Sequence, residues 1–204
     1  MDETKEKGYP ALNCTRLQGT ESFHSGGQSL GFSLLSFWQW SVSDLVDNTQ
    51  RGVLAEFLVA RALGIGLSEI RRSWDSYDLT SPTGVKIEIK SAAFLQSWSQ
   101  KGVSTISFNV QPRRAWDSEN GYEETPRRHA DVYVFALLAE TRKERLDPLD
   151  LAQWEFYVLP TKVLNERKRS QHSITLKSLQ ALTSRIAWAD LAREIETAAG
   201  KNAV

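Results

Sequence analysis

The chain is poor in the residues that build cysteine-rich or histidine-rich sites. Its 204 residues include one cysteine, Cys14, and three histidines, His24, His129 and His172. A lone cysteine excludes an internal disulfide and a cysteine-rich zinc site. Because the histidines are scattered, their spacing matches neither a zinc site nor an HNH nuclease motif.

Long apolar runs and net charge are also lacking. No apolar run reaches the ~18 residues of a membrane span, and the N-terminal stretch MDETKEKGYP is too polar for a signal peptide. We therefore expect a cytoplasmic protein without membrane contact. The 25 acidic and 25 basic residues give a formal net charge of zero, so bulk charge neither favours nor excludes nucleic acid as a partner.

Common nucleotide and hydrolase motifs are missing as well. The sequence contains neither G-x-x-x-x-G-K-[ST] nor G-x-G-x-x-G, so it signals no NTPase and no dinucleotide enzyme. The segment GQSLG at 27–31 matches the G-x-S-x-G elbow of serine hydrolases, with Ser29 as nucleophile. However, the preceding GTESFHSG is not the buried strand that this elbow requires, so we do not expect a serine hydrolase.

The polar and apolar patterns predict one α/β domain. Residues 1–29 are rich in glycine, serine, threonine and charge, which predicts a polar N-terminal tail, and residues 30–204 form the domain. The patterns predict helices at about 31–47 and 50–63 and strands at about 74–80, 85–92, 103–110, 131–139 and 154–160. They also predict a helix with Thr161 as its N-cap and two short helices at about 177–183 and 188–199. We expect a mixed central sheet of about five strands flanked by helices.

The stretch VKIEIKSAA at 85–93 carries the strongest chemical signal. Its apolar and polar residues alternate with the two-residue period of a half-buried strand. Glu88 and Lys90 therefore share one face of that strand, roughly 7 Å apart. On this pattern alone, a merely solvated polar face remains an alternative.

The segment before this strand brings a second carboxylate to the same face. SYDLTS, at 76–81, is joined to the strand by Pro82-Thr83-Gly84, which favours a three-residue loop with a G1 bulge. That loop places Asp78 opposite Glu88, and Ser76 opposite Lys90. Opposed like charges destabilise a sheet, and a divalent cation such as Mg²⁺ removes the conflict because it binds carboxylate oxygens.

A third carboxylate lies in the helix predicted over 50–63. Glu56 is surrounded there by small and apolar residues, so we expect its side chain to be mostly buried and directed toward the hairpin. A buried carboxylate needs a cation, hydrogen bonds or a metal. A salt bridge to Arg71 or Arg72 is the structural alternative to a role in a site.

Together these residues resemble the motif of the PD-(D/E)XK nucleases, which have the restriction-endonuclease-like fold. The order is a helix glutamate, Glu56, then Asp78-x9-Glu88-x-Lys90 on a hairpin, and the resemblance extends over about 50–140, including the apolar strand DVYVFALLA. One departure is Tyr77, which stands where the motif often has proline.

The resemblance implies an α/β/α core and phosphodiester cleavage that depends on Mg²⁺, with Mn²⁺ as a substitute. In that family Asp78 and Glu88 would be metal ligands, and Lys90 would position or polarise the attacking water. Glu56 would be a further ligand or a water-orienting group. A downstream glutamine helps to hold the site in some of these nucleases, which makes Gln96 a candidate; an ordinary polar position is the alternative.

Basic residues elsewhere are candidates for binding nucleic acid. Arginine can bind backbone phosphates, and aromatic residues can stack on bases. The candidates are Arg113, Arg114, Arg127 and Arg128 in the segment 112–130, and Lys168 and Arg169 in NERKRSQH at 165–172. A solvated loop is the alternative for 112–130, because the charges of that segment balance, and a solvated helix end is the alternative for 165–172.

The sequence therefore predicts a metal-dependent endonuclease that acts on DNA rather than RNA. A homodimer is compatible with this prediction, because cutting two strands invites two sites. The alternative from another class is a non-catalytic nucleic-acid-binding or assembly protein on the same fold. A purely structural α/β domain would follow if the four motif side chains did not converge.

Overall fold

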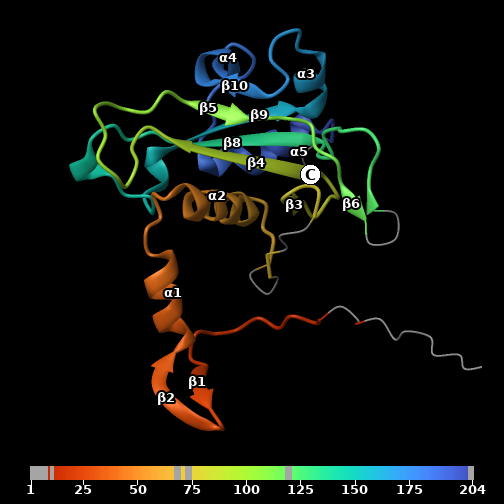
Figure 1. Ribbon diagram of the computed structural model, residues 1–204. Helices are drawn as coiled ribbons and strands as arrows, with labels where there is room; N and C mark the ends of the chain where they lie inside the picture. The colour runs from red at the N-terminus through yellow and green to blue at the C-terminus, as the bar shows by residue number, and fades with distance from the viewer. Residues whose placement is uncertain (1–8, 10–11, 67–69, 72–74, 118–120, 202–204) are drawn as a thin grey trace, which may run out of the picture.

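A computed structural model of the protein describes residues 9, 12–66, 70–71, 75–117 and 121–201. Its centre is a four-stranded mixed sheet in the order β3-β4-β8-β9 (Figure 1). These strands are β3 (Leu79–Thr80), β4 (Lys86–Ala93), β8 (Val132–Leu138) and β9 (Trp154–Pro160). β4 runs parallel to β8, whereas β3 and β9 run antiparallel to their neighbours.

The apolar run around β8 forms the middle of the sheet, as predicted. All seven residues of β8 are buried, and the strand pairs with β4 on one side and β9 on the other. A strand covered on both faces needs apolar side chains at every position, not only at alternate ones. The expectation of a central strand is therefore confirmed, and β9 has the bounds that the sequence predicted.

Two separate apolar layers cover the two faces of the sheet. On one face, α2 (Asn48–Ala62) and α5 (Leu191–Ala198), the latter preceded by η3 (Trp188–Asp190), pack against residues such as Ile87, Ile89 and Val134. On the other face, Phe135, Tyr157 and neighbouring side chains pack against β5 (Ser107–Asn109), β10 (Ser173–Thr175), α3 (Thr161–Glu166) and α4 (Leu176–Gln180). Figure 1 shows α2 beneath the sheet and β5, β10 and α4 above it.

Helix α2 lies where the sequence predicted it, with both ends marked by capping residues. Asp47 accepts hydrogen bonds from the backbone N–H of Thr49, at 2.9 Å, and of Gln50, at 3.4 Å. Gly64 follows the helix with a φ of +68°, the left-handed conformation that commonly ends a helix. These caps fix the direction of α2 beneath β4.

Several predicted bounds differ from the structure because pairing depends on distant partners. The predicted strand 103–110 shortens to β5, which pairs with β10 outside the central sheet, so that sheet has four strands and not about five. The described part of the predicted strand 74–80 pairs only over Leu79–Thr80. The predicted helix 31–47 shortens to α1 (Leu34–Val42). Thr161 is the first residue of α3 and not its N-cap, because its hydroxyl donates to the Ala130 carbonyl oxygen.

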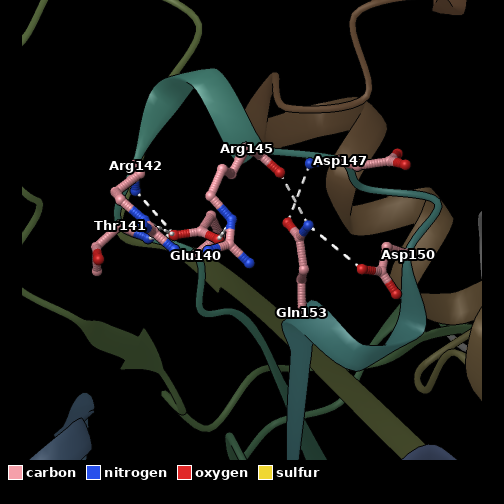
Figure 2. A network of polar contacts seen from close by, with 7 residues as sticks. All are labelled: Glu140, Thr141, Arg142, Arg145, Asp147, Asp150 and Gln153. Atoms are coloured by element: carbon pink, nitrogen blue, oxygen red, sulfur yellow. Dashed lines mark hydrogen bonds and ion pairs between the residues drawn. The ribbon is translucent and has the colours of Figure 1, made fainter.

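The long connection between β8 and β9 contains η1 (Lys143–Arg145) and η2 (Leu151–Gln153). Figure 2 shows a network of polar contacts within this connection. The Gln153 amide donates to the Arg145 carbonyl oxygen at 2.9 Å and accepts from the Asp147 N–H at 3.0 Å. Glu140 accepts from the two backbone N–H groups that follow it, and these bonds lower the pKa of its carboxyl. The network holds the ends of the two strands together.

Residues 22–33 form a hairpin that the sequence pattern did not predict. β1 (Ser22–Ser25) pairs with β2 (Gln28–Ser33), and both lie beside α1, away from the sheet (Figure 1). A second small hairpin joins β6 (Trp116–Asp117) to β7 (Gly121–Tyr122). Over the described residues, no helix is both long enough and apolar enough to span a membrane.

Candidate active site

The β3–β4 hairpin has the register that its turn residues predicted. Leu79 lies opposite Ile87, and Thr80 opposite Lys86. The Ser81 N–H donates to the Val85 carbonyl oxygen at 2.8 Å, which closes the loop over Pro82-Thr83-Gly84. Gly84 has a φ of +85°, the left-handed conformation that this loop requires. The pairs end at Leu79, so the predicted pairing of Asp78 with Glu88 is not among them, but the Asp78 carboxylate is close enough to Glu88 to raise the pKa of that group.

Asp78 lies where β3 stops pairing with β4. Its backbone N–H donates to the Ile87 carbonyl oxygen at 3.0 Å. The next donor along β4, the N–H of Ile89, is bonded not by a strand carbonyl but by the Asp78 carboxylate, at 2.6 Å. A strand edge without a partner leaves such donors unsatisfied, so the side chain of Asp78 completes the ladder here. This bond fixes the carboxylate at the edge of the sheet.

Glu88 and Lys90 project from the same face of β4 and form an ion pair. Their side chains retain exposures of only 15% and 21%. Burial raises the pKa of Glu88, and the nearby Asp78 carboxylate raises it further, while Lys90 and Arg113 act in the opposite direction. Asp78 and Lys90 therefore act on Glu88 in opposite directions, and the net effect of burial and the nearby charges is a raised pKa.

The raised pKa of Glu88 gives a stability prediction for the metal-free protein. Because the folded-state pKa lies above the unfolded value of about 4.3, ionising Glu88 costs stability as pH rises through that range. Glu88→Gln should therefore unfold at a higher temperature than wild type at pH 7, and the difference should vanish near pH 3. Thermal melts in a chelator at both pH values measure this.

A matched control for Glu88→Gln is Glu166→Gln at the exposed end of α3, where the side chain is 65% exposed. This control should melt like wild type at both pH values. A lower melting temperature for Glu88→Gln than for wild type at pH 7 would contradict the prediction, because it would mean that the Lys90 ion pair outweighs burial and repulsion.

Glu56 is mostly buried, as predicted, and is bonded to Arg71. Its side chain is 12% exposed and accepts from Nε of Arg71 at 2.5 Å and from Nη2 at 2.8 Å. This pair is the structural alternative that the sequence left open; the other arginine considered, Arg72, lies outside the described residues. Pairing with Glu56 raises the pKa of Arg71, and Asp78 acts in the same direction. Arg71 is therefore bonded to Glu56 and close enough to Asp78 to be affected by its charge.

Glu56 and Asp78 line one pocket of about 550 Å³ beside α2 and β3. Its wall includes the apolar and aromatic side chains of Phe57, Ile70 and Tyr77. Asp78 thus lines this pocket and is also close enough to Glu88 to raise the pKa of that group. The charge of Asp78 therefore acts on both ion pairs, Glu56–Arg71 and Glu88–Lys90.

Glu56→Gln separates a structural role from a chemical one. The variant removes the carboxylate charge that pairs with Arg71, whose side chain is 40% exposed. Because solvent screens such a pair, the free energy of unfolding should fall by only about 1 kcal/mol. Arg71→Gln breaks the same pair but keeps the carboxylate. If Glu56 acts in catalysis, only Glu56→Gln should lower kcat, by about tenfold or more. Equal cleavage by both variants would remove Glu56 from the site.

The donor set of the hairpin fits a hard divalent cation. Mg²⁺ typically takes one or two carboxylates together with waters and substrate phosphate, and Asp78 and Glu88 supply two carboxylates whose mutual repulsion a cation would relieve. Within the described part of the chain, no group of three or more histidine, cysteine, aspartate or glutamate side chains could hold a metal ion by itself. Water and phosphate oxygens would therefore complete the ligand set.

Tyr133 is a polar neighbour of this site that the sequence pattern did not single out. It pairs with Glu88 across the parallel β4–β8 ladder and is 4% exposed. Burial raises the pKa of its phenol to about 12, and Glu88 contributes in the same direction. The phenol therefore stays protonated and can donate a hydrogen bond. The only sequence feature that could have pointed to Tyr133 was the position of its hydroxyl-bearing side chain within a run of apolar residues.

The predicted nucleic-acid-binding residues fall into two groups. Arg113, Arg114, Lys168 and Arg169 are exposed, and Arg127 is exposed and paired with Glu123 at 2.8 Å. Arg128 instead donates to the carbonyl oxygens of Val110 and Gln171 and to Asn165. Gln96 is 8% exposed and donates to the Ala93 carbonyl oxygen and to Ser104. Arg128 and Gln96 thus brace loops, whereas Arg113 is near enough to Glu88 to influence its pKa.

Asp78, Glu88 and Lys90 supply two carboxylates and an ammonium group at the end of β3. These are the kinds of side chain that metal-dependent phosphodiester hydrolases use. Residues 33–178 match the family described as bacteriophage T4 endonuclease IV, and the chain belongs to this family. The match covers well over half of the chain and includes Glu56, Asp78, Glu88 and Lys90. Membership places the protein among the endonucleases, enzymes that act on nucleic acid. No curated protein matches the chain.

Proposed function

We propose that this protein is a Mg²⁺-dependent endonuclease that hydrolyses phosphodiester bonds in DNA. The observation that supports the proposal is the group of charged side chains at the end of β3, where Asp78 is close enough to Glu88 to raise its pKa and Lys90 is paired with Glu88. Family membership supports nucleic acid as the substrate class. The β3–β4 hairpin, the parallel β4–β8 pair and α2 against one face support a restriction-endonuclease-like core.

In this proposal Asp78 and Glu88 hold the metal. Glu56 is not a third ligand, because no three such side chains in the described residues could hold a metal ion together, and its proposed role is to orient water. A bound Mg²⁺ supplies charge stabilisation at the phosphate and lowers the pKa of a coordinated water. Lys90 orients that water and stabilises the negative charge that develops on the phosphate oxygens. The water oxygen forms a bond to phosphorus and gives up a proton to solvent, while the bond to the leaving sugar oxygen breaks and that oxygen takes up a proton from solvent. Arg113 is suited to hold a backbone phosphate beside Glu88.

Cleavage assays test the proposal directly. Purified full-length protein is incubated with labelled single-stranded DNA, double-stranded DNA and RNA, in Mg²⁺, Mn²⁺, Ca²⁺ or a chelator. We expect cleavage of DNA with Mg²⁺ or Mn²⁺ and none with chelator. Binding without cleavage under every condition would support the non-catalytic alternative, and cleavage that persists in chelator would overturn the metal-dependent mechanism.

A further inference from the structure

The N-terminal part of the described chain forms an arm that projects from the α/β domain (Figure 1). We define the arm as residues 17–42, which contain β1, β2 and α1. No residue of α1 is buried, and every residue of β1 is exposed. The domain itself therefore leaves the surface of the arm almost uncovered.

The arm is nevertheless a folded unit with its own hydrogen bonds. The N–H groups of Leu34 and Leu35 donate to the carbonyl oxygens of Glu21 and Gly19, at 2.9 and 2.8 Å. The Glu21 carboxylate accepts from the N–H groups of Gln18 and Gly19. Phe23 and Phe32 stack with their ring centroids 4.8 Å apart. These contacts fix the start of α1 against the hairpin and present a preformed surface.

That surface is strongly apolar. Eight large apolar side chains of the arm are each at least 39% exposed: Leu17, Phe23, Leu30, Phe32, Leu35, Phe37, Trp40 and Val42. Trp40 is the extreme case, at 85%. Helix α1, with the sequence LLSFWQWSV, is apolar nearly all round, and such helices are normally buried. So many exposed apolar side chains within one short segment are typical of an interaction site.

Charge argues against nucleic acid as the occupant of the arm. The arm carries a single formally charged side chain, Glu21, and its charge is negative. Binding to a nucleic-acid backbone depends on lysine and arginine to neutralise phosphates. The arm has none, so the covering surface should be apolar protein.

We propose that the arm packs against a second copy of this chain and forms a twofold symmetric homodimer. Twofold dimers are the commonest oligomers, and each copy contributes the same patch to the interface. Because the arm carries a single formally charged side chain, two copies of its apolar surface can pack together with little electrostatic repulsion. Exposed aromatic residues such as Trp40 and Phe32 are the type that dominates binding energy in such interfaces.

The oligomeric state of the full chain tests the proposal. Light scattering after size exclusion and sedimentation across a concentration series should show a dimer for wild type. The double variant Phe32→Glu/Trp40→Glu should raise the dimer dissociation constant by about 30-fold or more. The control Trp98→Glu changes a tryptophan that is 53% exposed outside the arm and should leave the dimer intact. Circular dichroism and thermal melts check that the domain of each variant is folded.

Each outcome decides the proposal without reference to nuclease activity. A wild-type chain that is monomeric up to millimolar concentration would overturn it, as would a double variant that dimerises like wild type. Fluorescence anisotropy with labelled DNA tests nucleic acid as the alternative partner of the arm. If wild type is monomeric and only the arm variant loses DNA affinity, the arm binds nucleic acid and the dimer is excluded.

Discussion

Lys90→Ala is expected to lower kcat for DNA cleavage by roughly 10²- to 10³-fold, the range observed when a group that stabilises transition-state charge is removed. The Lys90 ammonium is held beside Glu88 on β4 at low exposure, so its charge is little screened by solvent. Because the lysine acts on the reacting phosphate and water, kcat should fall more than KM rises. Steady-state kinetics with a labelled oligonucleotide under saturating Mg²⁺ measure both constants.

Controls for Lys90→Ala separate lost chemistry from lost folding. Lys162→Ala removes the same charge from a side chain that is 81% exposed on α3, and Ser29→Ala removes the hydroxyl of the G-x-S-x-G sequence. Both should cleave at the wild-type rate. The double variant Glu88→Gln/Lys90→Ala leaves no unpaired carboxylate behind and should fold at least as stably as Lys90→Ala. Full activity of Lys90→Ala would refute the role proposed for this lysine.

Mg²⁺ is expected to stabilise the wild-type fold, and Asp78→Asn should abolish most of that stabilisation. A ligand that binds only the folded state at 100 times its dissociation constant adds about 2.7 kcal/mol to the free energy of unfolding. In a domain of this size that corresponds to a rise in Tm of roughly 5–10 °C. The cause is relief of the Asp78–Glu88 repulsion in addition to metal coordination.

Asp78→Asn is a conservative test because the amide oxygen can still accept from the Ile89 N–H. The variant should therefore fold in chelator about as stably as wild type but respond weakly to Mg²⁺. Urea unfolding with and without Mg²⁺ measures the difference, and Na⁺ at matched ionic strength controls for screening. An equal response of both proteins to Mg²⁺ would place the metal elsewhere, and no response in wild type would count against the metal site.

Local patterns predicted the hairpin that carries the candidate site. The alternation in VKIEIK sets the face of Glu88 and Lys90, because successive side chains of a strand point to opposite faces. Pro82-Thr83-Gly84 sets the register, because a two- or four-residue loop would have moved Asp78 to the other face. Both signals depend only on neighbouring residues, and the observed pairs of β3 and β4 confirm them.

Other features of the site depend on residues that are distant in sequence. The burial of Glu56 followed from its apolar helix, but the sequence offered Arg71, Arg72 and a metal as equal partners, and only the fold brings Arg71 within 2.5 Å. The bond from Ile89 to the Asp78 carboxylate arises because β3 ends early. Tyr133 meets Glu88 only through the parallel pairing of β4 with β8, which no local pattern encodes.

The sequence by itself therefore predicted β4, β8, β9 and the α2 helix, and it singled out Asp78, Glu88 and Lys90 as candidate site residues, since periodicity and turn chemistry act over a few residues. Only the tertiary structure decided which strands pair, since that choice depends on packing the two apolar layers together. It placed β5 beside β10 outside the central sheet and left the arm uncovered by the domain. The exposure of the apolar residues around Trp40 follows from packing and not from the local pattern, which for an all-round apolar helix predicts burial.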